Sequence, residues 1–92
     1  MKTWEEFSMR YYSAQLSKDP LDFYGCVNAE GEWFDSSNSF DIAVHWCCYS
    51  AGEYDLTNEG EVRWMTEEGN KLGYSIIHGA MLKQMYEKGL IK

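Results

Sequence analysis

The longest nearly uninterrupted apolar run of the chain, residues 40–49 (FDIAVHWCCY), limits the possible folds more than any other feature. Its large or branched side chains alternate with the remaining ones: Phe40, Ile42, Val44, Trp46, Cys48. A period of two is typical of a β-strand with one buried face. Helix-like segments at the two ends of the chain are the only candidates to cover that face. We therefore expect a central strand packed against terminal helices.

The same run also fits a helix. Ser39 would be a suitable N-cap, and Gly52 would be a suitable stop after the last turn. One helical stripe would then hold Phe40, Ala43, Val44, Cys47, Cys48 and Ala51. Branched and aromatic residues favour strands, so the strand is the preferred interpretation and the helix is the alternative.

Helix signals occur at both ends of the chain. Thr3 followed by Glu6 matches a capping box and predicts a helix from Trp4 to Ser17, which Asp19-Pro20 would end. Near the other end, Thr66 with two acids in the next turn predicts a helix that continues to about Lys88. Its inward residues are expected to be Leu72, Ile76, Ile77, Ala80, Met81 and Met85.

Two hairpins are expected between the helices. Residues 21–27 alternate, residues 28–31 carry a turn signal, and residues 32–35 supply the returning strand. Residues 54–56 and 62–65 flank a polar turn and predict a second hairpin or one long bent strand. The expected fold class is α+β, with an antiparallel sheet of about four strands against N-terminal and C-terminal helices. The length predicts a single compact domain spanning residues 1–92.

Cysteine usage and hydropathy indicate the compartment. Three cysteines are an odd number for a secreted disulfide framework, and the N-terminus has no signal-peptide pattern. No apolar run approaches the length of about 18 residues that a membrane helix needs. We therefore expect a cytoplasmic protein without membrane contact.

Charge is distributed unevenly along the chain. The net charge is −7, but residues 19–68 hold twelve acids and a single base, Arg63, which is a net −11. From Gly69 onward four lysines face one glutamate. Such one-sided charge is self-repulsive, and a basic partner would relieve the repulsion. Direct binding to nucleic acid is not expected, because no basic patch is present.

Several acids are spaced two residues apart. On an extended chain the members of such a pair would project from one face about 6.6 Å apart, close to two nucleotide rises of DNA. The pairs are Glu30/Glu32, Glu53/Asp55 and Glu59/Glu61. The acids expected to imitate phosphates are Asp22, Glu30, Glu32, Asp35, Glu53, Asp55, Glu59, Glu61, Glu67 and Glu68. The simpler alternative is that the charge run is a solvated face.

No residue pattern predicts catalysis or cofactor binding. His45, Cys47 and Cys48, with Cys26 and His78 elsewhere, are zinc-ligand types, but their spacing matches no known CxxC-based site. Buried cysteines more often pack a core, so neither a metal site nor an activated thiol is expected. Residues 55–60 resemble the start of an EF-hand loop, yet Thr66 stands where the final acid should be. We expect a protein that is not an enzyme.

The chain is similar in length and acidic character to the anti-restriction nuclease (Arn) family of T-even phages, notably in residues 19–68. The similarity covers the chain as size and acidic surface, and no motif aligns residue by residue. The resemblance implies a double-stranded DNA mimic and a homodimer. It further implies that the mimic blocks the DNA-binding surface of a restriction endonuclease or of a nucleoid protein such as the histone-like nucleoid-structuring protein. The lysine-rich end of the chain departs from a uniformly acidic mimic.

The leading hypothesis is a non-enzymatic acidic inhibitor whose partner is a basic DNA-binding protein of the host. One alternative is an interaction module that docks through aromatic surface, like an anti-CRISPR-type inhibitor without DNA mimicry. The aromatic residues considered for that surface are Tyr11, Tyr24, Trp33 and Tyr54. The other alternative is a small metal-binding or thiol protein that uses His45 and the cysteines.

Overall fold

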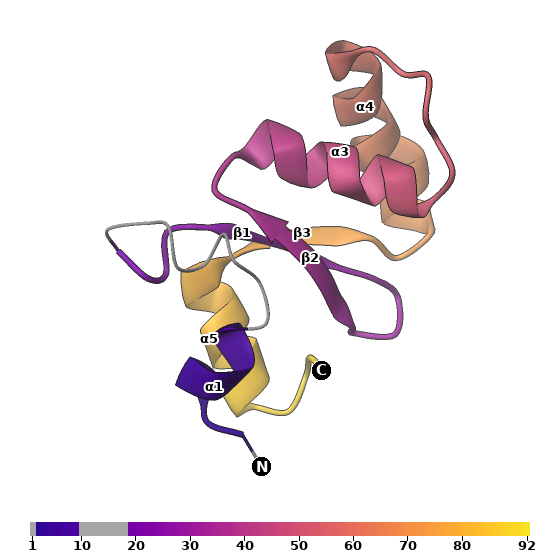
Figure 1. Cartoon of the computed structure of the whole chain (residues 1–92). Helices are drawn as coiled ribbons and strands as arrows, with labels where there is room; N and C mark the ends of the chain where they lie inside the picture. Colours follow the sequence, from indigo (N-terminus) through magenta and orange to yellow (C-terminus); the bar gives the residue numbers. More distant parts are fainter. Residues whose placement is uncertain (1, 10–18) are drawn as a thin grey trace.

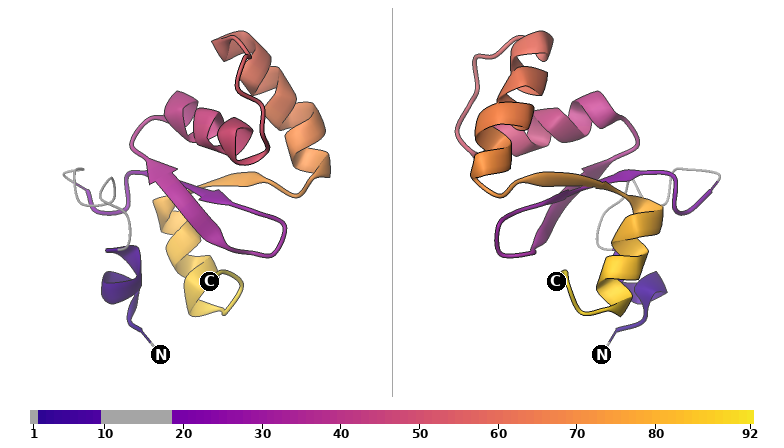
Figure 2. Two further views of the ribbon diagram at one scale, coloured as in Figure 1. Left: turned by 45° about the vertical axis from the view of Figure 1, so that its right-hand side comes forward. Right: turned by 180° about the vertical axis from the view of Figure 1, so that it is seen from behind.

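The computed structural model describes residues 2–9 and 19–92 of the chain. Within these residues, three antiparallel strands form one sheet in the order β2-β1-β3. The strands are β1 (Tyr24–Val27), β2 (Trp33–Ser37) and β3 (Ser75–His78). Helices lie on both faces of the sheet (Figures 1 and 2). The expected α+β class is confirmed, although the sheet of the described residues has one strand fewer than expected.

The first hairpin lies where the sequence predicts it. β1 pairs with β2 from Tyr24↔Ser37 to Val27↔Trp33, with an irregularity after Cys26. In the turn, the Asn28 side-chain oxygen accepts hydrogen bonds from the backbone N–H groups of Glu30 at 3.1 Å and Glu32 at 3.0 Å. Local side-chain bonds of this kind fix a turn without help from distant residues, which explains why this element could be predicted.

Residues 40–49 do not form the predicted central strand. They form the helix α3 (Phe40–Ser50), whose N-cap Ser39 accepts a hydrogen bond from the Ile42 N–H. After the C-cap Ala51, Gly52 takes the positive φ of 86° that often ends a helix. The buried residues are Ala43, Val44, Cys47 and Cys48, while Phe40 and Ile42 are exposed. The helical alternative is therefore correct, because both of its end signals were present.

The second predicted hairpin is also wrong. Residues 51–57 form a loop, and the helix α4 (Asn58–Trp64) continues directly into the π-helix η1 (Met65–Gly69). Thr57 caps α4 by accepting from the Gly60 N–H, and the acids of its first turn, Glu59 and Glu61, favour the positive end of the helix. The residues that the sequence predicts as a polar turn, 57–60, therefore form the beginning of a helix.

The single C-terminal helix predicted from Thr66 to Lys88 is divided by the third strand. The chain turns at Gly73, with φ 89°, and β3 pairs with β1 through Gly25↔Ile77 and Cys26↔Ile76 before α5 (Gly79–Glu87) begins. In α5 Leu82 is fully buried and the predicted core residue Met85 packs half-buried against the same core, whereas the predicted core residues Met81 and Leu72 are exposed. The branched isoleucines favour a strand, and the glycine permits the turn.

The N-terminal helix begins as predicted. α1 (Trp4–Ser8) is capped by Thr3, whose hydroxyl accepts from the Glu6 N–H at 3.2 Å. The predicted continuation to Ser17 falls on residues 10–18, which lie outside the described residues. No helix in the described part of the chain is both long and apolar enough to cross a membrane.

Two hydrophobic cores lie on opposite faces of the sheet. One is aromatic and joins α1 and α5 to the sheet through Trp4, Phe7, Phe23 and Trp33, with Leu82 beneath them. The other lies under α3 and contains Cys26, Ala43 and Cys47, surrounded by half-buried aromatic side chains. Alternate residues of β1 face alternate cores, since successive side chains of a strand point to opposite faces. The sheet is therefore covered on both sides.

Candidate acidic interface and its hollows

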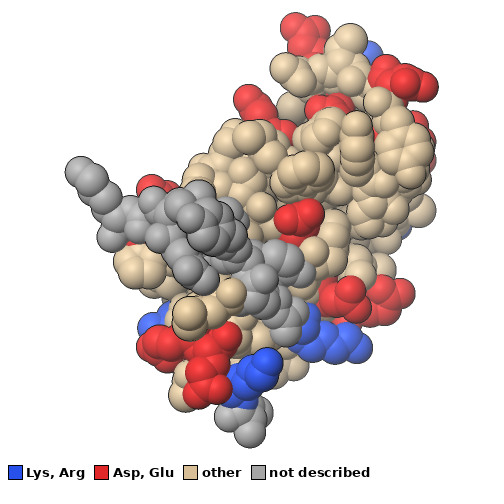
Figure 3. Space-filling view, viewed as in Figure 1, with Lys and Arg blue, Asp and Glu red and all other residues tan. Residues whose placement is uncertain are grey.

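Most of the net negative charge of the sequence falls in one layer of the molecule. We call residues 40–69, which comprise α3, the following loop, α4 and η1, the acidic layer. It holds seven acids and one base, a net charge of −6. Six of the acids are exposed: Asp41, Glu53, Asp55, Glu59, Glu67 and Glu68. Figure 3 shows acidic side chains with few basic atoms at the end of the molecule that carries α4, and acidic and basic side chains mixed at the opposite end.

The remaining predicted acids lie outside this layer. Glu30 and Glu32 are exposed in the β1–β2 turn, and Asp22 is exposed before β1, where its carboxylate lies 3.3 Å from His78 Nε2. Asp35 is half-buried on β2, and its carboxylate accepts a hydrogen bond from the Ser36 N–H at 2.8 Å. The structure thus places the predicted acids of residues 53–68 in the acidic layer and those of residues 22–35 outside it.

The expected two-residue spacing on extended chain is not found. Glu59 and Glu61 belong to α4, where residues two apart point in different directions. Glu53 and Asp55 lie in a loop, and Glu30 and Glu32 flank a turn. Within the described chain, the acids of these pairs are therefore not in regular strand rows, and any imitation of phosphates would depend on their grouping in the fold.

Glu61 differs from its acidic neighbours because it is buried. Its exposed fraction is 5%, and its carboxylate lies 2.6 Å from His45 Nδ1 on α3. The His45 ring in turn packs against Tyr49, with ring centroids 4.3 Å apart. This contact joins α3 to α4, so the buried Glu61 side chain has a structural role in the packing of these two helices. Its carboxylate is not placed to meet a partner protein.

The cysteines lie inside the protein. Cys26, Cys47 and Cys48 are free thiols with no exposed surface. The hydrogen bond with Cys47 and burial raise the pKa of Cys26, and burial with the nearby Glu61 carboxylate raises the pKa of Cys48 to about 11. Both thiols are therefore protonated at neutral pH, which suits packing and disfavours nucleophilic attack. No group of three metal-ligand types gathers within residues 2–9 and 19–92.

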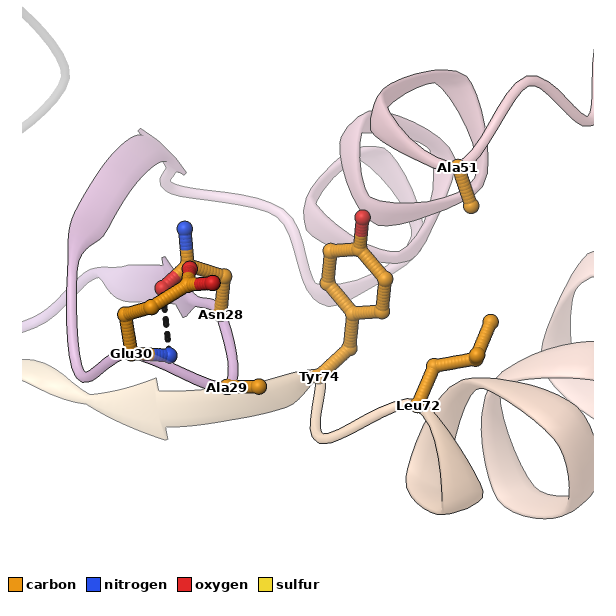
Figure 4. A pocket seen from close by; sticks show the side chains of 6 residues that line it. All are labelled: Asn28, Ala29, Glu30, Ala51, Leu72 and Tyr74. Carbon is orange, nitrogen blue, oxygen red and sulfur yellow. Dashed lines mark hydrogen bonds between the residues drawn. The ribbon is translucent and has the colours of Figure 1, made fainter.

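A hollow of about 260 Å³ lies between the β1–β2 turn, the end of α3 and the segment that enters β3 (Figure 4). Its lining residues are Asn28, Ala29, Glu30, Ala51, Leu72 and Tyr74, and we call it the Tyr74 hollow. Gly73 sets its width, because a Cβ at that position would lie 2.5 Å from the Ala29 Cβ. Only glycine allows the two segments to approach so closely.

Tyr74 stands at the centre of this hollow in Figure 4. Its hydroxyl lies 3.3 Å from the Ser50 hydroxyl on α3. Its ring packs against Phe34 and Trp64, with centroids 5.9 Å away in each case. These contacts from three elements fix the ring before any ligand arrives.

A second hollow of about 350 Å³ lies within the acidic layer. It is lined by Asp41 on α3 and by Asn58, Glu59 and Val62 on α4. Exposed apolar residues are also frequent in this layer: Phe40, Ile42, Tyr49, Tyr54, Leu56 and Val62. Acidic and apolar groups are therefore mixed on one surface.

Sequence reasoning missed the contacts that join distant segments. The His45–Glu61 pair spans 16 residues, and no local pattern connects the two. The sequence predicts Asn28 only as a turn residue, and the helix predicted from Thr66 to about Lys88 would hold Tyr74 in its interior. The useful signal was Gly73, since a glycine inside a helical pattern can indicate a break with a close backbone approach.

No protein-family model, curated protein or solved structure matches this chain. Its function is therefore inferred from its own residues and their arrangement.

Proposed function

We propose that this protein is a non-enzymatic inhibitor, active in the cytoplasm, that imitates double-stranded DNA and occupies the DNA-binding surface of a basic host protein. A restriction endonuclease or a histone-like nucleoid protein would present such a surface. The observation that carries the proposal is the gathering of six exposed acids in the acidic layer, with Arg63 as its single base.

The electrostatic reasoning is direct. Exposed like charges in one layer repel each other, which costs stability unless a partner of opposite charge binds there. Residues 2–9 and 79–92, which contain α1 and α5 and form the opposite layer of the molecule, hold three acids and four lysines and have no excess of acid. The polarity of the molecule thus favours one orientation toward a basic surface, and steering by that field would accelerate association.

Two variants of equal net charge test the proposal. In one, Glu53, Asp55 and Glu59 of the acidic layer become the corresponding amides. In the other, Glu5, Glu6 and Glu87 of α1 and α5 become Gln. Each variant and the parent are immobilised, exposed to a bacterial lysate at low salt and eluted with a salt gradient. Bound DNA-binding proteins are identified by mass spectrometry.

The proposal expects the acidic-layer variant to release these proteins at clearly lower salt, while the α1/α5 variant behaves like the parent. Short duplex DNA added in excess should displace the same proteins, because mimic and DNA compete for one surface. Equal elution of the two variants, or a partner that binds duplex DNA and this protein at once, contradicts DNA mimicry.

A second candidate function rests on the exposed apolar groups of the acidic layer. Tyr54 is 63% exposed and Ile42 is 47% exposed, and both lie beside acids in sequence. Such a surface would suit an interaction module that docks by apolar contact. Trp33, one of the aromatic residues first considered for docking, is fully buried and takes no part. Salt distinguishes the two functions, since an apolar interface hardly weakens as ionic strength rises.

A further inference from the structure

The Tyr74 hollow combines three groups that favour one kind of ligand. Glu30 supplies a carboxylate, Tyr74 supplies an aromatic ring, and Leu72 supplies an apolar wall that is 55% exposed (Figure 4). Within residues 2–9 and 19–92, the Glu30 carboxylate has no hydrogen-bond or ion-pair partner, and only its backbone N–H is engaged, with Asn28. The acid is therefore available to a ligand.

The end of α3 adds to the negative potential of this hollow. Ala51, the C-cap of α3, lines the hollow, and the last turn of α3 carries no base. The carbonyl groups at a helix C-terminus carry a partial negative charge that favours cations. Lys71, next to Leu72 in sequence, points to Glu68 at 3.7 Å, and Lys92 donates its backbone N–H to the Gly31 carbonyl at 2.9 Å. Neither lysine is among the lining residues. An anion is thus disfavoured.

Size and shape narrow the choice of cation. A hollow of about 260 Å³ is smaller than the roughly 300–1,000 Å³ of typical small-molecule sites, so it suits a side chain. A guanidinium group is planar, stacks on aromatic rings and pairs with a carboxylate through two parallel hydrogen bonds. Its aliphatic stem can lie along an apolar wall. A lysine ammonium offers neither the flat face nor the paired donors.

We propose that the Tyr74 hollow binds an arginine side chain of the partner protein, stacked on Tyr74, paired with Glu30 and packed along Leu72. This inference rests on the proposed function: the hollow borders the acidic layer at Ala51, so the arginine would belong to the basic surface that this layer meets. It adds a specific anchor to a contact that charge alone would leave diffuse. Tyr74 is held in place before binding by ring contacts with Phe34 and Trp64 and by the contact of its hydroxyl with Ser50. Less conformational entropy is therefore lost when the arginine binds.

The experiment uses three peptides of equal length, nona-arginine, nona-lysine and nona-citrulline, as probes of the whole chain. Citrulline keeps the shape of arginine but removes its charge. Binding is followed by two-dimensional NMR of the backbone amides and by calorimetry at moderate salt. We expect nona-arginine to shift the amide signals of Glu30, Leu72 and Tyr74 most strongly, nona-lysine to shift them less, and nona-citrulline to leave them unchanged.

Matched variants separate the anchor from general electrostatics. Glu30→Gln and Glu32→Gln change the same charge in the same exposed turn, but only Glu30 lines the hollow. We expect Glu30→Gln to weaken nona-arginine binding about tenfold, as loss of one charge-assisted pair would. Glu32→Gln should weaken it less than about twofold. Leu72→Ser, which leaves the net charge unchanged, should also reduce affinity.

The outcomes distinguish this inference from the proposed function. Salt-dependent binding of nona-arginine with equal effects of Glu30→Gln and Glu32→Gln would overturn the arginine anchor and leave the acidic-layer proposal in place. Equal shifts with nona-citrulline would also overturn it, because the site would then not require a cation. Failure of the acidic-layer proposal appears separately, as identical salt elution of the two triple variants.

Discussion

Glu61 is an acid whose role is set by one contact. Its buried carboxylate meets His45 Nδ1 at 2.6 Å, and the two residues connect α4 to α3. In Glu61→Ala the His45 ring nitrogen loses its carboxylate partner, but the His45 side chain is 37% exposed, so water can take the place of the carboxylate. The net loss of such a hydrogen bond is about 0.5–1.5 kcal/mol. We expect the free energy of unfolding to fall by that amount, as measured by chemical denaturation.

Glu59→Ala is the control for this change. Glu59 lies in the same helix two residues earlier and is exposed, so its removal should change stability by less than about 0.5 kcal/mol. Similar losses in the two variants would show that the His45–Glu61 contact contributes nothing specific.

The buried Cys48 thiol is expected to make the free energy of unfolding depend on pH in the alkaline range. Burial, with the nearby Glu61 carboxylate, raises the pKa of this thiol from 9.0 to about 11. Because the folded state favours the neutral thiol, the contribution of Cys48 to the free energy of unfolding is fully present below pH 9. It is lost as the pH rises through about 11. We expect denaturation midpoints to fall over this range and to fall less in Cys48→Ala. If the denaturation midpoints of the parent and of Cys48→Ala fall equally at alkaline pH, the pKa of Cys48 is not raised.

Two substitutions in α3 distinguish the observed helix from the strand that the sequence predicts. On the helix, Ala43 faces the cysteine core with no exposed surface, and Ile42 is 47% exposed. On the strand that the sequence favoured, Ile42 would face the core and Ala43 would face away from it. We expect Ala43→Asp to unfold the protein, because an unpaired charge in the core costs several kcal/mol. Ile42→Asp should retain a cooperative transition near that of the parent in thermal melts monitored by circular dichroism.

The local signals of α3 explain why its type was difficult to predict. Alternation of large side chains and helical spacing were both present in residues 40–49, and branched residues favoured the strand. The sheet decides between them. β1 has Cys26 on the face beneath α3, and only a helix brings Ala43 and Cys47 together onto that thiol. The Cys26 thiol donates to the Ala43 carbonyl at 3.3 Å, a contact that the order of the residues cannot reveal.

The whole molecule carries its excess charge on one side, and this predicts a salt effect on stability. Raising ionic strength from about 0.01 M to about 0.1 M shortens the Debye length from about 30 Å to about 10 Å. Repulsion among the exposed acids of the acidic layer then weakens in the folded protein. We expect salt to raise stability by about 1 kcal/mol, seen as a melting temperature higher by about 4–8 °C for a domain of this size.

The triple amide variant of Glu53, Asp55 and Glu59 provides the comparison. It should melt higher than the parent at low salt and respond less to added salt, because three of the repelling charges are gone. A parent protein whose melting temperature is unchanged by salt would show that the acids of this layer are too far apart to repel one another.

The sequence by itself determined the features that depend on neighbouring residues. Thr3 caps α1, Asn28 fixes the β1–β2 turn, and the α+β class follows from the presence of helix and hairpin signals together. The excess of acid in residues 19–68 is likewise a property of the chain. Each of these rests on hydrogen bonds or charges a few residues apart, and such terms do not need the fold.

Only the tertiary structure decided which interactions join distant residues. It converted residues 40–49 into a helix over Cys26, inserted β3 where a continuous helix was predicted, and withdrew Glu61 from the surface to meet His45. It also created the Tyr74 hollow from three segments of the chain, residues 28–30, Ala51 and residues 72–74. Burial against a sheet can outweigh local propensity differences of about 1 kcal/mol, so the choice among locally acceptable conformations was made by packing.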